Sequence, residues 1–397
     1  MSKISVNPEI LRWARETAGL SIDVAARKLA IGATKDLEPE QRLDLLESGG
    51  EKPTRALLLK MAKQYRRSLL IFYLSDIPQK GDRGEDYRRL PEEFPVEENA
   101  LVDALVRDVK VRQGIVRSAM EDDDDLVELP FIGSMETSSS INEICESIKS
   151  WINFDLDTFR AQNKVSDAFS YVRTQAETAG IFVLLIGDLG SHHTKITVEA
   201  FRGFALSDAL APFIIINDDD AKTAWTFTLF HELAHLWLGQ TGISGNYADS
   251  QLEILCNNVA SQLLLPNNEV SEIDVREDAD LGELIEKIEY FADERNVSRT
   301  MVSYALLKLN IIDEARWNEL RRSFRKKWLD LKAVIRAKAK KGRGGPSYYQ
   351  VRQHRVGTAL IVFVSRMLAS GSLSSTKAGK VLGVKSRNVY ALTQRVA

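Results

Sequence analysis

The stretch that decides the interpretation of the chain is FTLFHELAHLWLG, residues 227–239. Read as a helix, it places His231 and His235 one turn apart, offset by about 40° around the axis and about 6 Å along it. Both imidazoles can therefore reach one metal ion, with Glu232 beside them. Because the chain holds only five histidines in 397 residues, a chance HExxH match has a probability on the order of half a percent. The pattern predicts a metal-binding helix rather than two ordinary core or surface histidines.

A catalytic metal site also needs a third ligand, which is expected downstream on a second helix. Glu253, in the stretch 251–266, meets this requirement. Between His235 and Glu253 the first helix can end at Gly239, a Gly/Ser/Asn-rich loop can turn the chain, and the second helix can return antiparallel. Cys256 is the rival third ligand, although its aliphatic neighbours favour a small buried apolar role. The expected result is a His₂Glu site with an open fourth position.

The open fourth position gives such a site its chemistry. Water bound there has its pKa lowered to about 7 and becomes a nucleophile near neutral pH. Glu232 is the candidate base that takes its proton and later protonates the leaving amine. Asn257 lies four residues after Glu253 and could hold a ligand imidazole by its other ring nitrogen. The alternative for Asn257 is a plain helix residue.

Three motifs together resemble a known family. They are the HELAH motif, the pattern ExxCNxxAxxLLxP at 253–266, and the pattern GF…PxIxIN at 203–217. They are similar to those of the ImmA/IrrE metallopeptidases, and more closely to the longer members with an XRE-type helix-turn-helix at the N-terminus. The resemblance covers residues 1–310 well and the remainder weakly.

The resemblance implies both a cofactor and a substrate. It implies Zn²⁺, or another divalent ion such as Mn²⁺, held by His231, His235 and Glu253, with Glu232 as the catalytic base. Family members cut a partner regulator, commonly a helix-turn-helix repressor, and thereby switch on genes. The expected substrate is therefore a repressor or antitoxin-like protein from a neighbouring gene.

Composition sets the outer limits of the interpretation. A chain of 397 residues with 44% hydrophobic content can form two or three cores of ordinary domain size. No N-terminal segment combines a basic start with an apolar run, and nothing approaches the ~18 apolar residues of a spanning helix. We therefore expect no membrane partner. Two cysteines, Cys145 and Cys256, provide no disulfide framework, which is typical of a cytoplasmic protein.

Charge is distributed unevenly along the chain. The net charge is −3, yet residues 321–343 hold eleven Lys/Arg against one acid, Asp330, a local net of +10. The other 374 residues together therefore carry −13. An acidic run at 121–125 is expected in a flexible connection. The concentrated positive charge makes the C-terminal part the better candidate for contact with DNA.

Residues 1–78 are predicted to form an XRE-like helix-turn-helix domain. A helix capped by Asn7 is followed by Gly19 and by Ser21, which starts the next helix. Between Ala26 and Glu47 the chain has about seven more residues than the compact motif uses. The expected recognition stretch holds Lys35 and Arg42 against the acids Asp36, Glu38, Glu40, Asp44 and Glu47. Phosphate binding requires the opposite sign, so docking of a protein partner or packing is preferred over DNA binding.

A linker at 79–98 is predicted to lead into a metallopeptidase domain at 99–310. Helices are expected at 99–120, 141–153 and 166–179, and strands of a small sheet at 180–186, 203–206 and 212–217. The 203–206 strand is the candidate sheet edge that pairs with the substrate backbone. One aspartate of 218–220 is expected to cap the metal-binding helix, with a second metal as the alternative.

A basic helical segment and hinge are predicted at 311–345, followed by a helix-turn-helix-like domain at 346–397. Its would-be recognition helix carries the nucleic-acid candidates Arg387, Asn388 and Arg395. The alternative is a small three-helix domain with a solvated cationic face.

The expected fold class is α+β and predominantly helical, with a zincin-like peptidase domain and a small sheet flanked by helix-turn-helix-like domains. The expected function is that of a zinc-dependent endopeptidase that cleaves a partner regulatory protein to control gene expression. The alternative is a DNA-binding transcriptional regulator whose peptidase domain is non-catalytic or self-cleaving.

Overall fold

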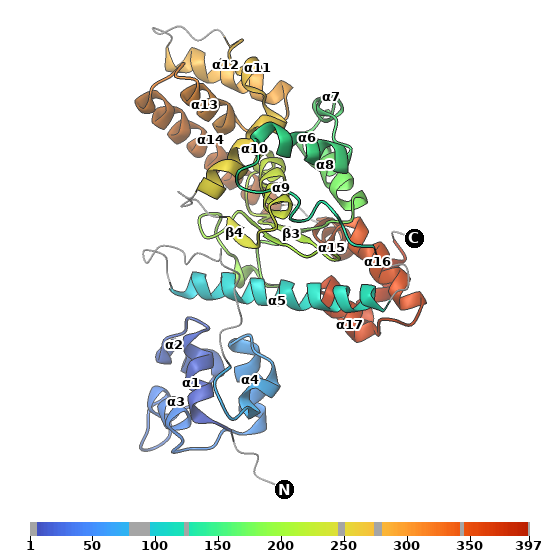
Figure 1. Cartoon of the computed structure of the whole chain (residues 1–397). Helices are drawn as coiled ribbons and strands as arrows, with labels where there is room; N and C mark the ends of the chain where they lie inside the picture. Colours follow the sequence, from blue (N-terminus) through green and yellow to red (C-terminus); the bar gives the residue numbers. More distant parts are fainter. Residues whose placement is uncertain are drawn as a thin grey trace. The chain divides into compact units, whose positions relative to one another are not determined.

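A computed structural model describes residues 6–78, 96–122, 127–244, 251–273, 280–341 and 345–395 (Figure 1). The chain divides into two compact units, Met1–Val109 with Asp188–Ala200, and Lys110–Gly187 with Phe201–Ala397. Many helices accompany one four-stranded sheet, so the predicted α+β, predominantly helical class is confirmed. Most of the predicted linker, most of the acidic run and part of the predicted hinge lie outside the described residues.

Within the described parts of the chain, no helix combines the length and the apolar character needed to cross a bilayer.

The N-terminal part of the first unit is a bundle of short helices. Its elements are α1 (Pro8–Glu16), α2 (Ile22–Leu29), α3 (Pro39–Ser48), α4 (Arg55–Gln64) and the 3₁₀ helix η1 (Leu69–Tyr73). Asn7 caps α1 by accepting a hydrogen bond from the backbone N–H of Glu9. Small side chains on α2, Ala25 and Ala26, are fully buried, which allows neighbouring helices to pack closely. The predicted helices and the Asn7 cap are therefore present, whereas Ser21 occupies the N-cap position of α2 without a side-chain cap hydrogen bond.

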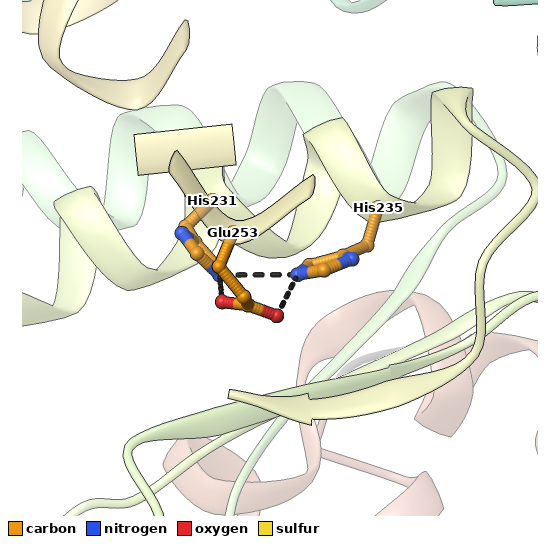
Figure 2. Close-up of side chains that lie close together, drawn as sticks. All are labelled: His231, His235 and Glu253. Carbon is orange, nitrogen blue, oxygen red and sulfur yellow. Dashed lines mark hydrogen bonds and ion pairs between the residues drawn. The ribbon is translucent and has the colours of Figure 1, made fainter. Parts of the chain in front are cut away.

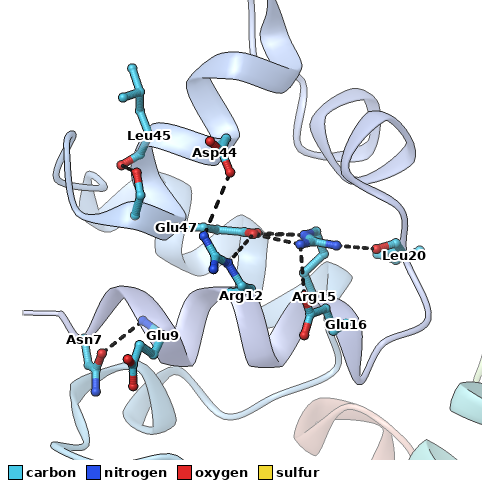
Figure 3. A network of polar contacts seen from close by, with 10 residues as sticks. Asn7, Glu9, Arg12, Arg15, Glu16, Leu20, Asp44, Leu45 and Glu47 are labelled. Atoms are coloured by element: carbon cyan, nitrogen blue, oxygen red, sulfur yellow. Dashed lines mark hydrogen bonds and ion pairs between the residues drawn. The ribbon is translucent and has the colours of Figure 1, made fainter.

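A buried ion pair joins α1 to α3 in this bundle (Figure 3). Arg15 Nε lies 2.8 Å from Glu47 Oε1, and Arg15 Nη2 lies 2.9 Å from Glu47 Oε2. Arg15 Nη1 also donates to the carbonyl oxygen of Leu20 at 2.9 Å. The Glu47 side chain is 0% exposed. Glu47 belongs to the acidic stretch expected at the recognition position, and here it stabilises the bundle.

The second unit contains the sheet and the remaining helices. Helix α5 (Val96–Glu121) begins in the first unit and continues into the second. The elements that follow are α6 (Ile141–Ile152), α7 (Leu156–Arg160), α8 (Val165–Thr178), β1 (Phe182–Leu185), η2 (His192–Thr194, in the first unit), β2 (Gly203–Leu206), β3 (Phe213–Ile216) and α9 (Lys222–Trp237), the helix of the HExxH motif. Those after it are β4 (Gly242–Ser244), α10 (Gln251–Leu264), α11 (Asn267–Val270), α12 (Leu281–Glu294), α13 (Arg299–Lys308), α14 (Glu314–Lys341), α15 (Tyr348–Val356), α16 (Thr358–Ala369), α17 (Ser375–Leu382), η3 (Ser386–Asn388) and α18 (Val389–Thr393).

The sheet has the strand order β1-β3-β2-β4. Strand β1 is parallel to β3, whereas β2 runs antiparallel to both β3 and β4. Gly203 on β2 is paired with Ile216 on one side and with Ser244 on the other. The prediction that 203–206 is a sheet edge is therefore wrong. The pairing partner β4 is only three residues long and follows a glycine turn, so it gives no periodic strand signal.

Helix α9 is a core helix rather than an amphipathic surface helix. All its residues from Thr228 to Trp237 are buried. The Trp237 ring stacks on Phe131 with centroids 4.4 Å apart, and its Nε1 donates to Ser147 Oγ at 2.9 Å. Phe230 packs edge-on against Phe154 at 4.8 Å. These contacts hold the backbone that carries His231, Glu232 and His235.

The three aspartates before α9 do not cap it. The N-cap residue is Ala221, and no side-chain cap hydrogen bond is present, so this prediction is wrong. Instead, Asp218 pairs with Arg355 at 2.7 Å and Asp219 with Lys332 at 3.0 Å. These carboxylates thus anchor α15 and α14, a use that depends on long-range packing and has no local sequence signal.

Candidate metal centre

His231 and His235 on α9 converge with Glu253 on α10 (Figure 2). The Nε2 atoms of the two histidines lie 3.1 Å apart. The Glu253 carboxylate bridges them, with 3.2 Å from His231 Nε2 to Oε2 and 3.3 Å from His235 Nε2 to Oε1. All three side chains are buried. The structure therefore brings together the three residues predicted as ligands from the sequence.

The spacing of these atoms fits a divalent cation. Around an ion bound tetrahedrally at about 2.05 Å, neighbouring ligand atoms are about 3.3 Å apart. The Nε2–Nε2 separation of 3.1 Å is close to one edge of that tetrahedron, and each of these nitrogens has one Glu253 oxygen at a similar distance, Oε2 at 3.2 Å from His231 and Oε1 at 3.3 Å from His235. Two imidazoles and one carboxylate are also the donor set of catalytic zinc sites with one position left for water. The residues present can thus hold a metal ion.

Asn257 orients the first of the two imidazoles. Its Oδ1 lies 3.0 Å from His231 Nδ1. An amide oxygen accepts hydrogen bonds, so Nδ1 carries a proton, which leaves Nε2 as the ring atom that would bind a metal ion. Asn257 therefore contacts the second ring nitrogen of a predicted ligand, as expected for a residue that orients the imidazole.

Electrostatics favour an anionic carboxylate between two metal-binding rings. Burial by itself raises the pKa of Glu253, but hydrogen bonds from His231 and His235 lower it to about 2. Burial lowers the pKa of His231, and the neighbouring His235 lowers it further. The pKa of His235 is raised despite burial, because Cys256 and Glu253 hydrogen-bond to the ring. The site thus offers an anionic carboxylate beside two ring nitrogens to a divalent cation.

The candidate base lies at the interface of α9 with the sheet. Glu232 is fully buried. A Cβ built on Gly203 of β2 would lie 2.8 Å from Glu232 Oε1 and 2.6 Å from Thr228 Cγ2. Only a glycine therefore allows the β2 backbone to approach this carboxylate. This role of Gly203 was not predicted, although a glycine that starts a buried strand is the signal for a close backbone approach.

The burial of Cys256 was predicted from its neighbours, but its contact with His235 was not. It is fully buried, and its thiol is hydrogen-bonded to the His235 ring. Burial raises the pKa of this thiol. The contact between Cys256 and the His235 ring depends on the packing of α10 against α9, so the local sequence gives no signal for it.

The nucleic-acid candidates lie outside this cluster. Arg387 and Asn388 belong to η3, and Arg395 follows α18.

Comparison with known proteins supports the metal-site interpretation. Residues 187–307 match the model of a peptidase family, M78, described as the IrrE N-terminal-like domain. The matched segment contains His231, Glu232, His235 and Glu253. No curated protein and no solved structure matches the chain. The family match covers a minority of the chain, and over residues 187–307 it supports the resemblance to the ImmA/IrrE-type peptidases.

Proposed function

We propose that the chain is a zinc-dependent endopeptidase with a zincin-like site. The observation that carries the proposal is the convergence of His231, His235 and Glu253, whose ligand atoms all lie within 4.8 Å of one another. Glu232 is buried on the same helix, one residue after the first of these ligands. The match to an M78 peptidase domain supports the same reaction class.

In peptide hydrolysis, different residues of the chain would have different roles. A bound divalent ion would supply Lewis acidity toward the peptide carbonyl and toward water. Glu232 accepts a proton from the attacking water as the C–O bond forms, and it then delivers this proton to the amine nitrogen, which leaves as the C–N bond breaks. Asn257 keeps His231 in the tautomer that presents Nε2. Gly203 leaves the β2 backbone directly beside the base.

The proposed substrate is a partner regulatory protein, a repressor or antitoxin-like protein encoded by a neighbouring gene. The resemblance supports this substrate class. The N-terminal bundle adds a surface argument, because Asp36, Glu38 and Asp44 are exposed there. A DNA-binding repressor has a cationic face, and such a face is complementary to these carboxylates. The XRE-like bundle would then dock the substrate rather than DNA.

The test is incubation of the zinc-loaded protein with the purified product of the adjacent gene. The wild-type chain should release two fragments, and Glu232→Gln should release none while it retains bound zinc. Glu286→Gln, the same change at an exposed position on α12, serves as the matched control and should cleave normally. Equal cleavage by Glu232→Gln and wild type would refute the assignment of Glu232 as base.

The second candidate function is a DNA-binding regulator whose peptidase domain is non-catalytic or self-cleaving. The acid-free C-terminal segment favours it. Control of the target gene should be lost in Glu232→Gln if proteolysis of a partner is required. Persistence of that control favours the regulator, and a shortened form that depends on Glu232 indicates self-cleavage.

A further inference from the structure

The charged side chains of the C-terminal segment are all of one sign. After Asp330 the sequence contains no aspartate or glutamate, and residues 331–397 hold fourteen Lys/Arg. Two of the described cations are paired with acids elsewhere in the unit, Lys332 with Asp219 and Arg355 with Asp218. The surface of residues 345–395, called the C-terminal module below, therefore presents positive charge with no acidic side chain of its own.

The turn inside the module is tight. Helix α17 ends at Leu382, and Gly383 follows with a left-handed φ of +64°. The N–H of Val384 then donates to the carbonyl oxygen of Gly379 at 2.9 Å. A Cβ on Gly379 would lie 2.9 Å from Val384 O, so a larger residue would open the turn. This geometry places η3 and α18 against α17, as in a helix-turn-helix.

The segment after the turn has a buried face and an exposed face. Val389 and Leu392 are fully buried. Arg387, Tyr390 and Gln394 are exposed and follow one another at the three- and four-residue spacing of one helical face. The exposed side chains of this element and its flanks, called the outer face below, are Lys385, Ser386, Arg387, Tyr390, Gln394 and Arg395. Cations, an amide and a phenol together suit phosphates and base edges.

The module is fixed to the peptidase sheet and its covering helix. Arg173 on α8 donates to the carbonyl oxygen of His354 at 2.5 Å and to that of Val183 on β1. Glu177, one turn later, accepts from the N–H groups of Thr358 and Ala359 at 3.1 and 3.0 Å. These bonds hold the junction between α15 and α16 against the core.

A glycine makes this close approach possible. Gly357 has a φ of +87°, and a Cβ there would overlap the Glu177 carboxylate and the Arg173 guanidinium. A second contact comes from α5, where Arg112 donates to the carbonyl oxygen of Val381 at 3.5 Å. The module is therefore part of the same body as the metal centre rather than a tethered appendage.

We propose that the C-terminal module binds double-stranded DNA, with the outer face in the major groove and the surrounding cations on phosphates. A helical face with base-contacting side chains fits the major groove of a duplex. Because the module is fixed to the peptidase fold, binding of the module to DNA keeps the metal centre close to the bound DNA segment. This second step rests on the proposed function, since it brings a DNA-bound substrate within reach of the peptidase.

The test is fluorescence anisotropy of the full-length protein with a labelled mixed-sequence duplex of about 30 base pairs, titrated from ~50 to ~200 mM salt. Affinity should fall steeply with salt, because each phosphate contact releases counterions. Arg387→Ala should weaken binding roughly five- to tenfold near 0.1 M salt, because a base contact is lost, with little change in the log–log slope. Lys63→Ala, which removes one exposed cation from the N-terminal bundle, should change neither quantity.

Several outcomes would overturn the proposal. They are a duplex affinity that does not depend on salt, an equal loss in Lys63→Ala, and tighter binding of single-stranded RNA than of the duplex. Circular dichroism of Arg387→Ala should match wild type, because the side chain is exposed. Glu232→Gln must keep full DNA affinity, and Arg387→Ala must still cleave the substrate free in solution. Loss of DNA binding and loss of proteolysis are thereby recorded separately.

Discussion

The N-terminal bundle and the candidate metal centre each bury a glutamate, and they do so in opposite ways. In the N-terminal bundle the Glu47 carboxylate meets the Arg15 guanidinium in a two-point ion pair (Figure 3). In the metal centre the Glu253 carboxylate lies between two imidazole nitrogens (Figure 2). Arginine brings a permanent positive charge, whereas imidazole is a ligand that can exchange a proton for a metal ion.

The difference teaches how to separate a structural from a functional buried charge. The Arg15–Glu47 pair is complete within the chain, and it links two helices of one bundle. The metal centre concentrates donor atoms at the spacing of a cation's ligands, a geometry that contributes little to folding by itself. Mutation of the Arg15–Glu47 pair should therefore lower the free energy of unfolding, whereas mutation of the metal centre should lower metal affinity.

The largest effect is expected from Glu253→Gln, which keeps the shape of the side chain and removes its charge. Metal affinity should fall by more than about 100-fold, because even the loss of a group that only orients a ligand costs 10- to 100-fold. The free energy of unfolding of the metal-free protein should change by less than ~1 kcal/mol. Calorimetric zinc titration and urea denaturation with a chelator measure the two quantities.

Arg15→Met should give the opposite pattern. It leaves the Glu47 carboxylate buried beside an apolar side chain, which should destabilise the N-terminal bundle by about 3–5 kcal/mol. Zinc affinity should be unchanged. The double variant Arg15→Met/Glu47→Leu should recover most of the lost stability, since it removes both charges. Recovery below a third of the loss would show that packing around Arg15, rather than charge, is decisive.

The local part of this contrast was predictable from the sequence. His231, Glu232 and His235 follow from helical spacing alone, and Glu253 follows once a second helix is required. The helices and caps of the N-terminal bundle are likewise marked by single residues such as Asn7. These features depend on neighbours within one or two turns of helix, which is the range over which sequence patterns are informative.

The remaining features depend on contacts between distant segments. The pairing of β4 with β2, the approach of Gly203 to Glu232, and the Cys256 contact with His235 arise only when elements fold together. The same holds for the Arg173 and Glu177 bonds to the C-terminal module. No local pattern encodes such pairings, so the strand 203–206 was mistaken for an edge.

Asn257→Ala tests how far the metal centre extends beyond its ligands. Loss of the bond to His231 Nδ1 should reduce metal affinity by roughly 10- to 100-fold, because the imidazole tautomer is then no longer fixed. Asn258→Ala, at the next position on α10, is the control and should bind metal normally. Equal affinities in both variants would restrict the site to its three ligands.

A smaller effect is expected at Glu269, which receives hydrogen bonds from Arg160 and Arg295 at 2.9 and 3.0 Å. Burial acts to raise the pKa of Glu269, but these two bonds lower it below its ordinary value of 4.5. Its stabilisation is therefore present above pH 4.5 and is lost as the pH falls through the depressed pKa. Glu269→Gln should remove roughly 1 kcal/mol of this pH dependence. Urea denaturation between pH 3 and pH 7 provides the measurement, and identical profiles for both proteins would contradict it.

The central claim is tested most directly by metal stoichiometry, measured by plasma mass spectrometry after zinc loading and dialysis. We expect about one zinc ion per chain in the wild type and in Glu232→Gln, and close to none in His235→Ala. A wild-type chain that retains no metal, or a His235→Ala chain that retains as much as wild type, would contradict the account.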